Sequence, residues 1–187
     1  MERKLFLLIL SVIALGVLGL GFLVRTLNPS HQPSDSEWRL TISGLVQRPL
    51  SLTFDELVAL PRSTVNAELY CVDYPNTPVA KGDWAGVRLG LILENAGVSP
   101  EAVKVAFYAE DGFTTDLTVT TAMREDIILA YERDGEPLPE KLRLVVPRKW
   151  GYKWIREITN IELVDYDFKG YYESRGYSDT AEISEER

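Results

Sequence analysis

The chain has 187 residues, of which 45% are hydrophobic, and it carries 28 Asp and Glu against 20 Lys and Arg, with one His and one Cys. This composition excludes a collagen-like, a wholly disordered and a disulfide-rich chain, and the length suits one ordinary domain with an appendage. Residues 26–187 carry 17 Lys and Arg against 27 Asp and Glu, a formal charge of −10. Such an acidic domain is a poor candidate for binding nucleic acid, which requires positive charge against phosphates.

A membrane anchor is predicted at the N-terminus. Residues 5–24 contain 16 apolar residues, three Gly, one Ser and no charge. Twenty helical residues at about 1.5 Å each span the hydrocarbon core of about 30 Å, whereas a signal peptide has an apolar region of only about 7–15 residues. Arg3 and Lys4 favour a cytoplasmic N-terminus. We therefore expect residues 1–25 to form a single-pass anchor in the cell membrane, with the domain on the extracytoplasmic side. A cleaved signal peptide is the alternative.

A polar tether is predicted to follow the anchor. Residues 26–37 are rich in Pro and Ser and contain His31, the one His of the chain. A His in a tether is usually solvated. Acid–base catalysis by His, a Ser-His-Asp hydrolase and a zinc site with His ligands are therefore all disfavoured.

Two helices have recognisable ends in the sequence. Thr53 and Glu56 have the spacing of a capping box, which predicts a short helix over 53–60. A wide apolar face followed by Gly97 predicts a second helix over 87–96.

Strands account for most of the remaining pattern. Alternating or continuous apolar runs predict them over 39–44, 64–72, 103–107, 113–119, 129–132, 142–147 and 158–165. A helical turn is expected over 121–126, and the acidic tail from Ser178 is expected to fray. The predicted fold is α+β, one domain of short mixed strands and helices over 38–179, followed by an acidic tail over 180–187.

Cys71 is the most informative single residue. It is the only Cys, so it forms no intramolecular disulfide, and it lies at the end of a predicted strand before the polar loop 73–76. Loops beyond strand ends often carry functional sites. Three interpretations stay open: a small buried hydrophobe, a nucleophile without a His partner, or the thiolate ligand of a soft metal whose other ligands come from an organic cofactor.

Ordered motifs along the chain resemble the sulfite oxidase-like molybdopterin-binding oxidoreductase family, which includes periplasmic methionine sulfoxide reductase catalytic subunits. The similar segments are 68–73, 83–89, 108–115, 129–138, 142–155, 161–165 and 170–177. They cover most of residues 38–179. The resemblance implies the fold of that family and a molybdenum-molybdopterin cofactor. It also implies oxygen-atom transfer with a small substrate, sulfur compounds being among the candidates, and it assigns Cys71 as the catalytic residue and metal ligand.

The resemblance also implies which other residues bind the cofactor. Beside Cys71 these are Arg143, Lys149, Gly151, Tyr152, Lys153, Trp154, Ile155 and Arg156. Arg143, Lys153 and Arg156 are expected to face the anionic cofactor, since Arg and Lys bind phosphate well. The alternative is a solvated basic loop that pairs with nearby carboxylates. Tyr74 and Tyr152 are candidates for contact with the substrate.

The predicted function is thus a membrane-anchored, extracytoplasmic molybdopterin-dependent oxidoreductase acting on a small molecule. A redox partner protein is expected, because the sequence has no Cys spacing typical of haem attachment or an iron–sulfur cluster. The alternative is a non-catalytic binding module that keeps the fold without the cofactor.

Overall fold

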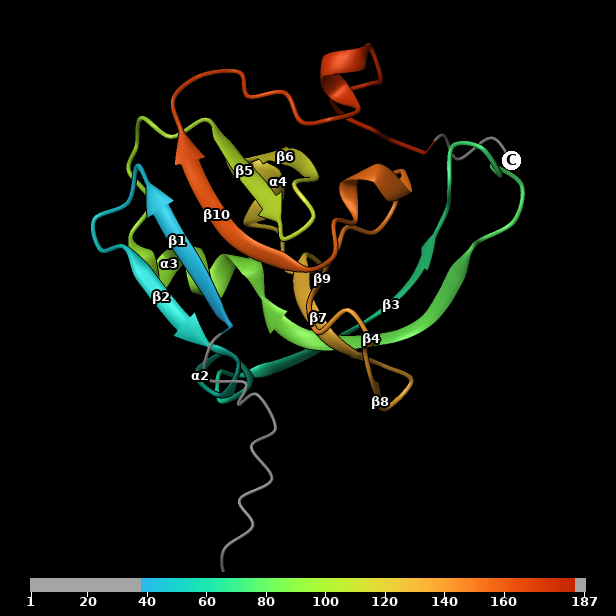
Figure 1. The fold of residues 1–187 in the computed structure, drawn as a ribbon, viewed down its shortest axis with the longest axis horizontal. Helices are drawn as coiled ribbons and strands as arrows, with labels where there is room; N and C mark the ends of the chain where they lie inside the picture. The colour runs from blue at the N-terminus through green and yellow to red at the C-terminus, as the bar shows by residue number, and fades with distance from the viewer. Residues whose placement is uncertain (1–37, 184–187) are drawn as a thin grey trace, which may run out of the picture. The chain divides into compact units, whose positions relative to one another are not determined.

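The computed structural model describes residues 38–183 as two sheets and several short helices (Figure 1). The strands are β1 Arg39–Gly44, β2 Leu50–Thr53, β3 Arg62–Leu69, β4 Ala80–Arg88, β5 Lys104–Ala109, β6 Thr114–Thr118, β7 Ile128–Arg133, β8 Glu136–Pro137, β9 Arg143–Val145 and β10 Ile158–Val164. The helices are α2 Phe54–Val58, α3 Leu89–Ala96, α4 Val119–Ala122, η2 Gly151–Lys153 and η3 Glu173–Arg175. The expected α+β class with short mixed strands is confirmed for these residues.

The first sheet joins the first strand of the described chain to the last, in the order β2-β1-β10-β5-β6. β1 lies parallel to β10, with Ile42 opposite Ile161, and the other neighbours pair antiparallel. Along β1 the buried residues Leu40 and Ile42 alternate with more exposed ones. β5 is buried along nearly its whole length, because β10 and β6 flank it and both faces are covered.

The second sheet has the order β3-β4-β7-β8, with β9 also paired to β7. The long strands β3 and β4 run antiparallel, and the chain passes from β4 directly into α3 (Figure 1). Trp84 of β4 packs edge-to-face against Trp154, with ring centroids 5.6 Å apart. Both indoles are almost fully buried in a core that receives apolar side chains from both sheets and from α3.

Both predicted helices are present, and their ends follow the expected chemistry. The Thr53 hydroxyl accepts a hydrogen bond from the Glu56 amide at 3.2 Å, and the Glu56 carboxylate accepts one from the Thr53 amide at 2.8 Å. This capping box begins α2. α3 ends at Gly97, which has a left-handed backbone.

Three strands, β2, β4 and the two-residue β8, have no counterpart in the sequence prediction. β4 contains Gly82, Asp83 and Gly86, residue types with low strand propensity, so its local pattern is weak. It forms because its backbone is paired on both sides, by β3 and by β7.

The prediction that the chain frays from Ser178 is wrong for residues 178–183. Ala181 is fully buried, and its carbonyl accepts a hydrogen bond from the Trp150 amide at 2.8 Å. The Ile183 amide donates to the Arg148 carbonyl at 2.9 Å. This part of the acidic tail is therefore packed against the segment that follows β9.

The expected anchor and tether, residues 1–37, lie outside the described residues. From residue 38 to residue 183, no helix has both the length and the apolar character needed to cross a membrane.

Candidate functional site

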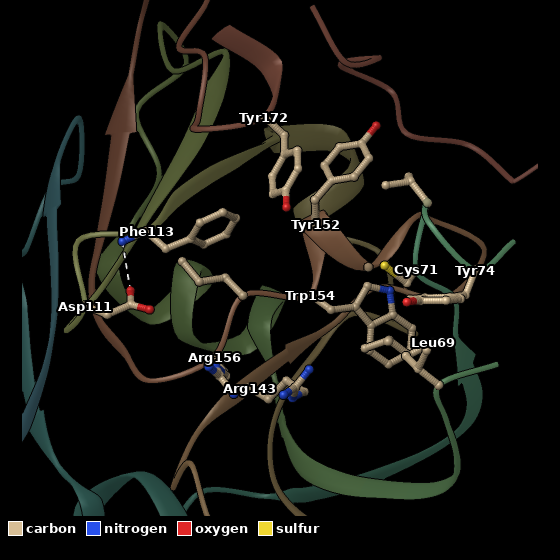
Figure 2. A pocket seen from close by; sticks show the side chains of 14 residues that line it. Leu69, Cys71, Tyr74, Asp111, Phe113, Arg143, Tyr152, Trp154, Arg156 and Tyr172 are labelled. Carbon is tan, nitrogen blue, oxygen red and sulfur yellow. Dashed lines mark hydrogen bonds between the residues drawn. The ribbon is translucent and has the colours of Figure 1, made fainter. Parts of the chain in front are cut away.

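A pocket of about 470 Å³ opens between the end of β3, the β5–β6 turn and the segment after β9 (Figure 2). It brings together one thiol, two guanidinium groups and several aromatic rings. The lining residues are Leu69, Cys71, Val72, Tyr74, Val79, Asp111, Phe113, Arg143, Gly151, Tyr152, Trp154, Ile155, Arg156 and Tyr172.

Cys71 lies in this pocket because β3 ends at Leu69 and the chain turns there. The Tyr74 amide donates to the Cys71 carbonyl at 3.1 Å, which closes the turn. The thiol is partly exposed and free of any disulfide, and its sulfur lies 3.8 Å from a carboxylate oxygen of Asp73. A partly exposed thiol on a loop fixed by a strand end is accessible to a ligand, which does not fit the interpretation of Cys71 as a small buried hydrophobe.

A close contact at Gly151 holds the segment after β9 beside Cys71. The Gly151 amide donates to the Tyr70 carbonyl at 2.7 Å, and a Cβ atom at Gly151 would lie 2.8 Å from that oxygen. A larger residue would push the two segments apart. Gly151 therefore holds the start of this segment against the loop that carries the thiol.

Phe113, Tyr152 and Tyr172 form one side of the pocket, which we call the aromatic wall (Figure 2). Tyr152 and Tyr172 are stacked with ring centroids 5.4 Å apart, and Phe113 meets Tyr172 edge-on at 6.0 Å. The Tyr152 hydroxyl donates to the Ser178 carbonyl at 2.7 Å. Burial, followed by the negative charge of Glu173, raises the pKa of Tyr152 to about 12. Tyr152 is therefore a neutral hydrogen-bond donor at neutral pH.

Arg143 and Arg156 bring positive charge to the pocket, apart from the tyrosines of the aromatic wall (Figure 2). A backbone bridge joins the two residues. Arg143 is half-buried, and its guanidinium donates to Glu140 at 2.5 Å. Burial disfavours the ionised Glu140 carboxyl, but the Arg143 hydrogen bond and both guanidinium charges outweigh it and lower the pKa of Glu140. Arg156 is exposed and makes no ion pair within residues 38–183, so it is available to an anion.

The other two basic residues expected at the cofactor do not line this pocket. Lys153 is fully buried, and its ammonium pairs with Glu173 at 2.6 Å and with Asp116 at 3.0 Å. Lys149 is also buried and pairs with Glu182 at 2.8 Å. In this structure the buried carboxylates hold the Lys153 side chain in the interior, away from the pocket lining, and its contact with the cofactor stays a prediction.

The other site residues predicted from the sequence all line the pocket, but their exposure differs. Gly151, Tyr152, Trp154 and Ile155 line the pocket together with Cys71. Tyr74 is 70% exposed at the pocket, whereas the Trp154 indole packs into the core and its nitrogen donates to the Lys149 carbonyl at 3.1 Å.

Sequence reasoning did not assign a site role to several lining residues, among them Asp111, Phe113 and Tyr172. Asp111 accepts the Phe113 amide at 2.9 Å and so fixes the β5–β6 turn (Figure 2). Phe113 and Tyr172 lie within segments that carry the family resemblance, and this was the available signal.

The pocket has the donor chemistry that a molybdenum-molybdopterin cofactor needs. The Cys71 sulfur is a soft ligand of the kind that molybdenum takes beside sulfur from an organic ligand. The guanidinium groups of Arg143 and Arg156 suit a phosphate, and the aromatic wall offers flat apolar faces. The residues present therefore fit a metal held by one protein thiolate, in a cofactor that carries a negative charge.

Comparison with known proteins defines the class. Residues 27–172 match the oxidoreductase molybdopterin binding domain family, so the chain belongs to this family of molybdopterin-dependent oxidoreductases. It is 36% identical over 148 residues to the uncharacterized oxidoreductase YuiH of Bacillus subtilis, which covers 76% of this chain and 73% of YuiH. The family, the enzyme class and the molybdenum-molybdopterin cofactor expected from the sequence are thereby confirmed.

More distant relatives are longer than this chain. The catalytic subunit MsrP of the protein-methionine-sulfoxide reductase of Gluconobacter oxydans is 30% identical, over 70% of this chain and 48% of MsrP. Mitochondrial sulfite oxidase of Drosophila melanogaster is 27% identical, over 83% of this chain and 32% of the oxidase. The crystal structure of the sulfane dehydrogenase SoxCD from Paracoccus pantotrophus superposes with a TM-score of 0.65 at 27% identity, over 71% of this chain and 39% of that chain. The chain thus spans about half of the length of MsrP and less than half of the sulfite oxidase and of the sulfane dehydrogenase chain.

Proposed function

We propose that the protein transfers an oxygen atom to or from a small substrate at a molybdenum ion ligated by Cys71. The observation that carries this proposal is the presence of one accessible thiol in the same pocket as Arg143 and Arg156. The cofactor, when bound, supplies a metal that exchanges two electrons and one oxygen atom with the substrate.

Each group of pocket residues has its own part in this proposal. The Cys71 thiolate donates charge to the metal and helps to set its potential. Arg143 and Arg156 bind the negative charge of the cofactor, Arg156 with the freer guanidinium and Arg143 with one already oriented by Glu140. The aromatic wall excludes water from the substrate and orients it, since aromatic side chains offer large rigid faces.

The substrate proposed is a small sulfur compound. Two observations favour it: the apolar and aromatic residues that line much of the pocket, and relatives named for a methionine sulfoxide and for sulfite. For a sulfoxide, two electrons and two protons would release the sulfide and one water. The electrons would come from a redox partner protein, as expected from the sequence.

Metal analysis of the full chain tests the proposal. The protein purified from a host that makes molybdopterin is expected to contain about one molybdenum and one pterin per chain and to reduce methyl phenyl sulfoxide with reduced benzyl viologen. Cys71→Ser is expected to abolish the turnover. Protein that contains neither metal nor pterin would instead favour the non-catalytic binding module.

The membrane anchor belongs to the same proposal and has a separate test. Residues 1–25 would hold the domain at the extracytoplasmic face of the cell membrane, and residues 26–37 would be the tether. Protease added to intact spheroplasts is expected to remove the domain while a cytoplasmic marker survives. Protection of the domain in the same spheroplasts would contradict this orientation.

A further inference from the structure

Two distant segments meet at the aromatic wall through two consecutive pairs of residues. Tyr152 stacks on Tyr172, and the next residue of each segment, Lys153 and Glu173, forms an ion pair of 2.6 Å. The rings line the pocket, whereas the side chains of the ion pair are each only 1% exposed. The ion pair thus joins the same two segments that carry the stacked rings.

The ion pair is also fixed to the first sheet. The Lys153 ammonium donates to the side chain of Asp116 at 3.0 Å and to its carbonyl at 2.9 Å. The Glu173 oxygen that pairs with Lys153 also accepts the Thr115 hydroxyl at 2.8 Å. Thr115 and Asp116 are neighbours on β6. Both charged groups are therefore held in direction as well as in distance.

The segment that carries Tyr172 lies close against β6. The Tyr171 amide donates to the Thr114 carbonyl at 2.9 Å, and a Cβ atom at Gly170 would lie 2.5 Å from the Thr115 Cα. This contact sets the height of the segment over the sheet. The position of Tyr172 along and across the sheet still depends on the residue that follows it, Glu173.

A buried ion pair is weak evidence for stability, because well-packed apolar residues often stabilise a fold as much or more. The particular contribution of this ion pair is the fixed direction of its hydrogen bonds, which packing between apolar side chains lacks. We propose that Lys153 and Glu173 are positioning residues that hold Tyr152 and Tyr172 together as the substrate-facing wall of the pocket. This inference rests on the proposed function, since it takes the wall to contact the substrate.

The test removes the ion pair without leaving one of its two charges buried and unpaired. In Lys153→Met/Glu173→Gln both partners become neutral, while Asp116 keeps its ion pair with Lys104. The control is Lys104→Met/Asp179→Asn, which removes a pair of 2.8 Å between the same C-terminal segment and the first sheet, together with the Lys104 pairs to Asp116 and Asp167 and the Asp179 pair to Lys169. In the control, Asp116 keeps its ion pair with Lys153, and neither mutated residue adjoins Tyr152 or Tyr172 in sequence.

The first measurement does not depend on activity. The full-length holoprotein is labelled with 3-fluorotyrosine, and the resonances of Tyr152 and Tyr172 are assigned with single Tyr→Phe variants. In Lys153→Met/Glu173→Gln both resonances are expected to move toward that of Tyr74, which is 70% exposed, while the control leaves the Tyr172 resonance in place. Unchanged resonances, or an equal change of the Tyr172 resonance in the control, would overturn the proposal.

The second measurement separates positioning from general damage. With methyl phenyl sulfoxide and reduced benzyl viologen, loss of an ordered aromatic contact is expected to raise KM about three- to tenfold at unchanged kcat and unchanged molybdenum content. In that reaction the S–O bond breaks, two reduced viologens supply two electrons, and two protons and the oxygen leave as water. A fall in kcat at unchanged KM would overturn the positioning role.

A milder variant keeps the test decisive if the double variant folds poorly. In Glu173→Gln the amide nitrogen can replace Oε2, which is buried and accepts no hydrogen bond within the described residues, so no contact is lost there. The same two resonances are expected to move in the same direction by less. Absence of sulfoxide turnover in the unaltered holoprotein would count against the proposed function alone, because the fluorine spectra still decide the positioning role.

Discussion

The basic side chains of residues 143–156 differ in where the fold places them. Arg143 and Arg156 line the pocket beside Cys71, whereas Lys149 and Lys153 are buried and paired with carboxylates. The two arginines offer planar forks that suit a phosphate, while Lys153 offers a compact charge that fits among several buried oxygens. The comparison teaches that clustering of positive charge along a sequence does not by itself identify a binding surface. Burial among carboxylates keeps Lys149 and Lys153 out of the pocket lining, whereas Arg143 lines the pocket although it pairs with Glu140.

The largest effect on stability is expected where the charge is buried. Lys153→Met leaves Glu173 buried without its partner, which is expected to cost about 3–5 kcal/mol of unfolding free energy. Arg156→Gln changes an exposed side chain and is expected to stay within about 0.5 kcal/mol. Urea unfolding of both variants measures the difference. Equal losses would mean that the two regions do not differ as described.

Arg156→Gln, which is expected to change stability least, is expected to have a large effect on cofactor binding. If Arg156 binds the cofactor as proposed, Arg156→Gln removes a charge-assisted hydrogen bond worth about 1.5–3 kcal/mol, and affinity for the cofactor is expected to fall about ten- to hundredfold. Pterin fluorescence per chain after extended dialysis measures the loss. Arg148→Gln is the matched control, because Arg148 is exposed and lies outside the pocket. Equal pterin loss in both variants would remove the special position of Arg156.

A smaller effect is expected from the carboxylate that orients Arg143. The pKa of Glu140 is lowered in the fold, so its contribution to stability is present above its ordinary pKa of about 4.3 and is lost as the pH falls through the folded value. Glu140→Gln is therefore expected to make stability less dependent on pH below about 4 than in the unaltered protein. Thermal unfolding between neutral and acidic pH measures this, and a steeper acid dependence in the variant would contradict the assignment.

Much of the fold was predictable because its signals are local. The capping box at Thr53 and the glycine after α3 mark helix ends by short-range chemistry, and most strands show apolar runs. β4 was not predictable in this way, since its stability comes from backbone pairing with β3 and β7. Ala181 is buried where the tail meets the backbone of Trp150, and no local sequence pattern predicts that contact.

The candidate site likewise contains residues that the sequence could predict and residues whose position depends on distant contacts. Cys71 and the two arginines could be selected from the family resemblance, and the structure brings them into one pocket. The direction of Lys153 could not be predicted, because it depends on Asp116 and Glu173, which are distant in sequence. The alternative for the whole basic stretch was pairing with nearby carboxylates. Such pairing is present at Lys149, at Lys153 and, through Glu140, at Arg143, but not at Arg156 within residues 38–183.

Counting the sulfur ligands of the metal tests the role of Cys71 most directly. X-ray absorption at the molybdenum edge is measured on the unaltered holoprotein and on Cys71→Ser, the variant of the only cysteine. If the Cys71 thiolate binds the metal, the variant either loses its molybdenum or retains a metal with one sulfur ligand fewer. The same number of sulfur ligands in a fully loaded Cys71→Ser protein would contradict that role.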